Sequence, residues 1–353
     1  MNTEALVARH QILNALARHS RGVDRADRTL IASAYHDGAT VDYGFFAGAA
    51  ASLAEILAEA QKASLATLHR TANCDIRVEG ARAISESYVI AYAEEVDVQR
   101  MVFGRYLDRH EWRDGTWRMT HRSYVLDSNT NRPSSALRPE PPLADDHFVP
   151  QGGKGAADPG RALLAHHHAS SQSLQKADPM TADPAALDAA LDAALSRDAI
   201  RRLVTTYCRG ADRADAALLA SVFWDDATVI SGVSNGGSGT FATDIAAHVS
   251  ANLDACFHSI ANEWIEVKGD HAIGEHYVIA HSRAGGEDMM TGGRYVDSYE
   301  RRGGVWKIAS RSFVCDWTST QPSTFESGGF YEALTLRGTQ DRSDPVYAHW
   351  ASL

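Results

Sequence analysis

The sequence predicts an α+β protein made of two tandem copies of one domain, in which helices come first and a curved antiparallel sheet follows. The segment RGVDRAD at residues 21–27 returns as RGADRAD at residues 209–215. Around it, 16 of 36 positions are identical between residues 9–44 and 197–232. Internal similarity with the same order and spacing indicates a duplicated structural unit.

A second match lies near the end of each copy and fixes the domain limits. Residues 104–127 and 293–316 are identical at 12 of 24 positions. The chain therefore divides into copy one (1–131), a linker (132–183), copy two (184–320) and a C-terminal tail (321–353). The linker is rich in Pro, Gly, Ser and Asp, which is typical of an extended connection. It contains His166–His168, for which we predict no metal site, because no carboxylates lie close by in the sequence.

The first elements of each copy are predicted to be helical. Residues 200–207 place apolar side chains at i, i+3, i+4 and i+7, which is the stripe of an amphipathic helix. Gly22 and Gly210 are expected to end this helix, because glycine adopts a left-handed cap without strain. Asp27 and Asp215 are expected to cap a second, short helix.

The later elements of each copy are predicted to build the sheet. In copy one, a strand at 39–44 and a third helix at 52–63 precede three strands. Residues 84–92 alternate in the manner of a strand. The dipeptides at 114–115 and 303–304 are typical of tight hairpin turns. The strands follow the helices without βαβ alternation, so the sequence predicts an α+β fold.

Composition excludes several classes of partner. The formal net charge is −11, with 45 acidic and 34 basic residues, so we expect no nucleic-acid partner. The sequence holds no apolar run that could span a bilayer, and its start reads as an amphipathic helix without the apolar segment of a signal peptide. We therefore expect a cytoplasmic protein without a membrane partner. The four cysteines form no CxxC pair, which argues against a disulfide framework or a zinc site.

Two pairs of residues are the candidate catalytic groups: Asp24 with His69, and Asp212 with His258. Of the six histidines in copy one, His69 is the one that has a histidine counterpart in copy two. A neutral imidazole accepts a proton near neutral pH, and a carboxylate on its other nitrogen fixes the tautomer. The alternatives are an aspartate in a solvent-exposed turn and a histidine that only fills the core. No GxSxG-like context indicates a covalent nucleophile.

Other polar and aromatic residues are predicted to line the same cavities: Arg105, Arg294, Glu86, Glu275, Tyr35, Tyr43 and Trp224. The arginines would stabilise developing negative charge, or would form exterior ion pairs instead. The aromatic residues would favour an aromatic ligand, or would fill the core. Arg122 and Arg311 also repeat, which a structural ion pair with Asp127 and Asp316 explains.

The order helix, RGVDRAD, helix, strand, helix, histidine, three strands resembles the SnoaL-like branch of the nuclear transport factor 2-like superfamily. Residues 221–232 and 292–308 carry the resemblance furthest in copy two. It covers about 260 of the 353 residues and implies two cystatin-like α+β cones. It also implies that Asp24 with His69, and Asp212 with His258, are catalytic dyads.

Members of this family include dehydrochlorinases and dehydratases that use no cofactor or metal. The resemblance therefore implies a cofactor-independent lyase that eliminates water, formaldehyde or halide. The expected substrate is a small apolar molecule, with aromatic compounds, lignin-derived ones among them, favoured. The alternatives are an isomerase or cyclase that uses the same base, and a non-catalytic binding module. We also expect a homo-oligomer, or an intrachain pseudo-dimer whose two sheets pack face to face.

Overall fold

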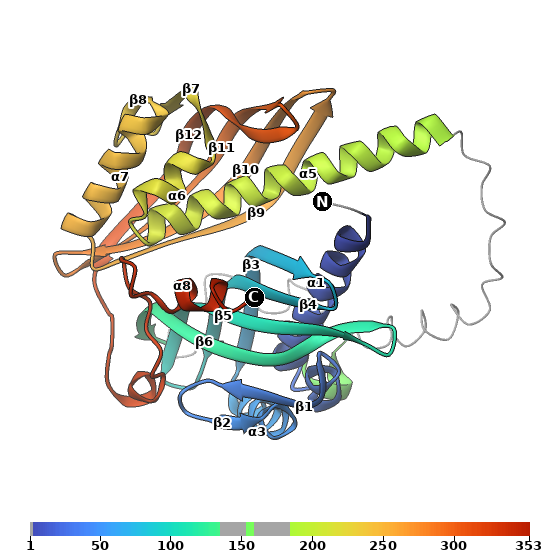
Figure 1. Cartoon of the computed structure of the whole chain (residues 1–353). Helices are drawn as coiled ribbons and strands as arrows, with labels where there is room; N and C mark the ends of the chain where they lie inside the picture. Colours follow the sequence, from blue (N-terminus) through green and yellow to red (C-terminus); the bar gives the residue numbers. More distant parts are fainter. Residues whose placement is uncertain (1–2, 135–152, 159–183) are drawn as a thin grey trace.

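A computed structural model describes residues 3–134, 153–158 and 184–353 of the chain. His166–His168 lie outside these residues. Copy one comprises α1 (Thr3–Asp24), α2 (Arg28–Ala32), β1 (Tyr35–Asp42), β2 (Ala47–Ala49), α3 (Ala50–Ala63), β3 (Ala66–Glu79), β4 (Arg82–Glu94), β5 (Val98–Arg113) and β6 (Thr116–Pro133). Copy two comprises α5 (Pro184–Asp212), α6 (Ala216–Ser221), β7 (Phe223–Ile230), β8 (Asn235–Gly237), α7 (Ser238–Asn252), β9 (Ala255–Lys268), β10 (His271–Ala284), β11 (Glu287–Arg302) and β12 (Val305–Pro322). The α+β fold and its duplication are confirmed (Figure 1).

Each copy has one six-stranded sheet, with the order β2-β1-β6-β5-β4-β3 in copy one and β8-β7-β12-β11-β10-β9 in copy two. The sheets are mixed, because β1 pairs in parallel with β6, and β7 with β12. The expectation of a fully antiparallel sheet was therefore wrong at this one pair. The predicted hairpin turns at 114–115 and 303–304 are present, with positive φ at both positions.

The sequence analysis missed β3 and β9, the long strands that carry His69 and His258. It placed these histidines between a helix and a strand. In β3 the pairing with β4 shifts register between Ala72 and Asp75, where Asn73 has φ 47°. This irregularity, together with polar residues on both faces, hides the period-two alternation that indicates a strand.

Gly22 and Gly210 do not end their helices, which continue to Asp24 and Asp212. A Cβ at Gly22 would lie 2.7 Å from Ile31, so the glycine allows α2 to cross closely over α1. The left-handed residue is instead Ala26, at φ 51°. None of the helices within the described ranges is long and apolar enough to cross a membrane.

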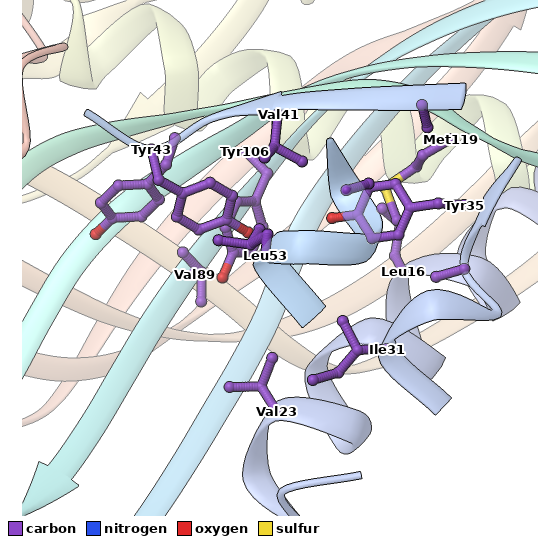
Figure 2. Packing of buried hydrophobic residues seen from close by; sticks show 14 of the residues in the cluster. Leu16, Val23, Ile31, Tyr35, Val41, Tyr43, Leu53, Val89, Tyr106 and Met119 are labelled. Atoms are coloured by element: carbon purple, nitrogen blue, oxygen red, sulfur yellow. The ribbon is translucent and has the colours of Figure 1, made fainter. Parts of the chain in front are cut away.

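The predicted caps of the short helices are confirmed. Asp27 accepts a hydrogen bond from Leu30 N, and Asp215 accepts one from Leu218 N, both at 3.0 Å. The helices pack on the inner face of each sheet around an apolar core, which Figure 2 shows for copy one. There Ile31 of α2 is fully buried in the same cluster as side chains from the strands.

The outer face of the copy-one sheet is buried by the second half of the chain. Tyr88 and Phe103 pack against Phe257 of β9, with ring centroids 4.9 and 5.4 Å apart. Arg209 and Arg213, at the end of α5, reach acidic residues on the same face. The repeated arginines of copy two therefore hold the two halves together.

The C-terminal tail returns to copy one and covers more of this face (Figure 1). Its short helix α8 (Pro345–Trp350) begins at Asp344, which accepts hydrogen bonds from Arg105 at 2.7 Å and Arg213 at 3.0 Å. Burial alone would raise the pKa of Asp344, but the two guanidinium groups hold it well below the usual carboxyl value. The tail thus belongs to the interface between the halves.

The outer face of the copy-two sheet remains largely open, so the expectation of two sheets packed face to face was wrong. Trp264 is 64% exposed and Tyr277 is 46% exposed, whereas Tyr88, the counterpart of Tyr277, is 1% exposed. Contact between the sheets is limited to one end of β9, β10 and β11, where Phe257, His281 and Met290 lie against copy one. The duplicated domains therefore occupy unequal environments.

This inequality predicts different effects of one substitution at two equivalent positions. Asp127 is 4% exposed and accepts hydrogen bonds from Arg105 and Arg213, whereas its counterpart Asp316 is 38% exposed and pairs with Arg294. We expect Asp127→Asn to lower the free energy of unfolding by about 3–5 kcal/mol, because it breaks a buried ion network. Asp316→Asn should change it little, since surface pairs are screened by solvent. Urea denaturation followed by circular dichroism measures both, and equal losses would contradict the assignment.

Candidate active site

A carboxylate and an imidazole meet in each copy at the junction of the first helix and the first long strand. Asp24 Oδ1 lies 2.7 Å from His69 Nδ1, and Asp24 Oδ2 accepts the His69 backbone N–H at 3.0 Å. In copy two, the corresponding distances from Asp212 to His258 are 2.6 and 3.1 Å. The sequence pairing of these residues therefore matches their spatial pairing.

Local backbone geometry positions each aspartate. Asp24 is the last residue of α1, and the left-handed Ala26 then turns the chain into the N-cap Asp27. Because one carboxylate takes both the backbone N–H and the ring Nδ1–H of the histidine, the imidazole has a fixed orientation and tautomer. The catalytically useful nitrogen is then Nε2, which has no hydrogen-bond partner among the described residues in either copy.

The second dyad is strongly polarised. Burial disfavours a charged His258, but the adjacent Asp212 carboxylate outweighs it, so the pKa of His258 is well above 6.5. At neutral pH this dyad is an imidazolium–carboxylate pair, and the neutral imidazole forms as the pH rises. His258 exposes 20% of its side chain, whereas Asp212 exposes none. Solvent or a ligand therefore reaches the histidine and not the carboxylate.

A cavity of about 200 Å³ lies inside the copy-two cone and has His258 in its wall. The lining is mainly apolar and aromatic, with Tyr207, Tyr295 and Phe313 on one side and residues of α7 on another. An apolar cavity with a single convergent polar group is the usual form of a small-molecule site. The arrangement can hold an apolar molecule against the imidazole.

The copy-one cone is filled differently. Tyr35 and Tyr43, both predicted to line a cavity, are buried in the core cluster, and each hydroxyl lies 3.3 Å from a ring nitrogen of His19. Burial raises the pKa of both tyrosines and lowers that of His19. His69 instead borders a groove of about 620 Å³ between α1 and β3. The two dyads therefore face different surroundings.

The predicted role of Arg105 and Glu86 inside the cavity was wrong. Arg105 is fully buried on the outer face of the sheet, where it donates to Glu86 at 3.1 Å and to Asp127 at 2.9 Å. Successive strand residues face opposite sides, and Tyr106 occupies the inner side. The ion pair that the sequence suggested between Arg105 and Glu86 is thus present, but it lies between the two halves.

The equivalent residues of copy two also lie outside the cavity. Arg294 donates to Asp316 at 3.0 Å and to Glu275 at 3.4 Å on the open outer face. Trp224 donates its indole N–H to the Glu300 carbonyl, with the guanidinium of Arg302 4.8 Å from its ring. None of the three can contact a ligand inside the cone.

Each cone contains a buried arginine that the sequence analysis paired with the wrong partner. Arg122 binds Asp108 through two hydrogen bonds of 2.7 and 2.8 Å, and Arg311 binds Asp297 at 2.8 and 2.6 Å. Their guanidinium groups lie over core tyrosines, Tyr106 in the case of Arg122. The signal that could have found these pairs is the aspartate repeated three residues after each GRY start.

Three described residues of copy two place donor atoms close enough to share a metal ion, namely Asp212, Cys256 and His258. Burial raises the pKa of the Cys256 thiol, which therefore stays protonated at neutral pH. A metal at this position would have to displace the proton that Asp212 shares with His258 Nδ1. Copy one offers Thr67 in place of the cysteine. The donor set suits the proton-sharing dyad better than a metal.

Two helix-covered, six-stranded sheets, each with an Asp–His pair, define a duplicated α+β cone protein. The SnoaL-like domain family matches residues 4–123 and 192–312. The chain therefore belongs to the SnoaL-like domain family, as its sequence pattern predicted.

Several relatives share this domain. The gamma-hexachlorocyclohexane dehydrochlorinase of Sphingobium indicum is 30% identical over 127 residues, covering 35% of this chain and 81% of the relative. Hexachlorocyclohexane dehydrochlorinase 1 of the same species is 29% identical, covering 34% and 80%. Among solved structures, the LinA-type3 dehydrochlorinase of Novosphingobium barchaimii has 26% identity and a TM-score of 0.33, covering 36% of this chain and 90% of that one. A cystatin-like protein of Nostoc punctiforme has 19% identity and a TM-score of 0.30, covering 35% and 92%.

The polarisation of the second dyad predicts a titration shift. We expect Asp212→Asn to lower the pKa of His258, because burial then acts without the opposing carboxylate. NMR titration of the imidazole resonances measures this, with Asp215→Asn as control, since Asp215 caps α6 and does not contact His258. An unchanged midpoint in Asp212→Asn would contradict the coupling.

The same shift gives the pH dependence of stability. Because the folded-state pKa of His258 is raised, the dyad stabilises the folded protein fully below the unfolded value near 6.5, and this contribution is lost as the pH rises through the folded pKa.

Proposed function

We propose that this protein is a lyase in which the histidine of an Asp–His dyad removes a proton from a small, largely apolar substrate while a small leaving group departs. The observation that carries the proposal is the orientation of the imidazole. Its Nδ1 is bound by a buried carboxylate, which leaves Nε2 as the basic atom beside an apolar cavity in copy two. A base positioned in this way contributes about 10²–10⁴ in rate.

The proposed step conserves atoms and charge. Neutral Nε2 of His258 takes a proton from one substrate carbon, a double bond forms, and the leaving group departs from the neighbouring carbon with its electron pair. Asp212 stabilises the imidazolium that results, and the proton then passes to the leaving group or to solvent. Water, halide and formaldehyde are the leaving groups that we propose, with a monocyclic and preferably aromatic substrate, lignin-derived compounds among them.

Relatives support the reaction class. The curated relatives of this chain carry the name hexachlorocyclohexane dehydrochlorinase, and the chain spans about four fifths of their length. Loss of HCl is an elimination of the kind that the dyad would perform. An isomerase would use the same base, and product mass separates the two reactions, because elimination lowers the substrate mass by that of the leaving group.

Turnover tests the proposal directly. The wild-type chain is incubated with gamma-hexachlorocyclohexane and with a panel of small aromatic alcohols and halides, and chloride, formaldehyde and product mass are measured. We expect the double variant His69→Ala/His258→Ala to lose at least about 100-fold in rate. The exposed His271, replaced by alanine, is the control. Full activity in the double variant would remove the mechanism.

The pH–rate profile gives a second readout of the same proposal. Because the basic form of His258 appears only as the pH rises through its raised pKa, we expect the rate at the copy-two site to increase into the alkaline range. Asp212→Asn should move the inflection to lower pH and reduce the plateau rate, because the imidazolium loses its stabilising carboxylate.

A further inference from the structure

The walls of the two cones differ at a position that decides whether a cavity exists. In copy two, Ser231 lines the cavity together with Tyr207, Tyr295 and Phe313. In copy one, the residue at the equivalent position of the repeat is Tyr43. A serine has thus been exchanged for one of the largest side chains at a cavity wall.

The ring of Tyr43 lies in the space that the cavity occupies in copy two. Its hydroxyl is 3.3 Å from His19 Nε2, its ring stacks on Tyr124 at 5.7 Å and 14°, and it lies 6.2 Å from the ring of Tyr106. These three neighbours are the counterparts of Tyr207, Phe313 and Tyr295, the residues that line the copy-two cavity. Tyr43 therefore contacts from inside the residues that a ligand would contact.

A second exchange acts in the same direction. Val23, which belongs to the copy-one core, stands where copy two has the cavity-lining Ala211. Figure 2 shows Val23, Val89 and Tyr106 in the same cluster as Tyr43. Val89 has an identical counterpart in Val278, so the wall itself is retained and the interior is filled.

We infer that Tyr43 closes the copy-one cone and that the chain binds its small apolar ligand only in copy two, beside His258. The inference rests on the function proposed above and assigns it to one of two dyads. A cavity of about 150 Å³ lined by apolar side chains accommodates benzene. The copy-two cavity, about 200 Å³, therefore fits a molecule with one six-membered ring and a few substituent atoms.

Access from the other side of the copy-one dyad is also restricted. The linker segment 153–158 lies across the end of α1, where Arg25 donates to the Gly153 carbonyl at 3.0 Å and Arg21 pairs with Asp158. Lys154 of the same segment binds the backbone at the end of α3. The segment thus ties the two helices together beside Asp24.

Binding stoichiometry tests the inference without any turnover. Isothermal titration with toluene should give one site per chain in the wild type, two in Tyr43→Ser, and none in Ser231→Tyr. Tyr43→Phe is the matched control and should keep one site, because it removes the hydroxyl and leaves the ring. Two sites in the wild type, or one site in a folded Tyr43→Ser chain, would overturn the inference.

A structural readout keeps the test decisive if a variant fails to fold. Crystals of the wild-type chain soaked with bromobenzene should show bromine anomalous scattering in the copy-two cone alone, and a bromine peak in the copy-one cone would overturn the inference. The outcome is separable from that of the lyase assay. Absence of elimination with one ordered bromobenzene in copy two would remove the proposed reaction and leave the single ligand site.

Discussion

The double hydrogen bond from one aspartate to one histidine is the interaction on which both halves of the molecule depend. Asp24 is 5% exposed and Asp212 fully buried, and a buried carboxylate must be paired or its desolvation is costly. Here the partner is the main chain and ring of a single residue on β3 or β9, so the end of the first helix is fastened to the sheet. Structural and chemical demands on the pair coincide, because the bond that satisfies the carboxylate also fixes the imidazole.

Around this common pair, the duplicated segment has taken on different contacts. In copy two, Arg209 and Arg213 bind acidic residues of the opposite half. In copy one, the equivalent Arg21 pairs with Asp158 of the linker. The repeated phrase therefore supplies a dyad aspartate, a helix cap and two anchoring arginines, and only the anchors depend on what lies outside the cone. A tandem repeat cannot give both copies the same neighbours unless it closes symmetrically.

That asymmetry explains what the sequence could and could not predict. Caps, turns and the dyad depend on local spacing or on repetition, and the structure contains them. The side of the sheet was beyond reach, because alternation tells which residues share a face and not which face is the inner one. Glu86 shares its face with Tyr88 and Ile90, which are buried by copy two rather than by the cone. The apolar pattern of an interface was thus mistaken for that of a cavity.

An empty apolar cavity is a stability defect, at about 24 cal/mol per Å³. For about 200 Å³ this amounts to roughly 5 kcal/mol, a large part of the stability of an ordinary domain. Copy one avoids the penalty by placing Tyr43 in its interior, and it also buries its outer sheet face under copy two and the tail. Copy two keeps both an internal cavity and an open outer face. The closed copy is then a support whose buried interface stabilises the open one, a division of labour that a single-domain protein with one cavity cannot make.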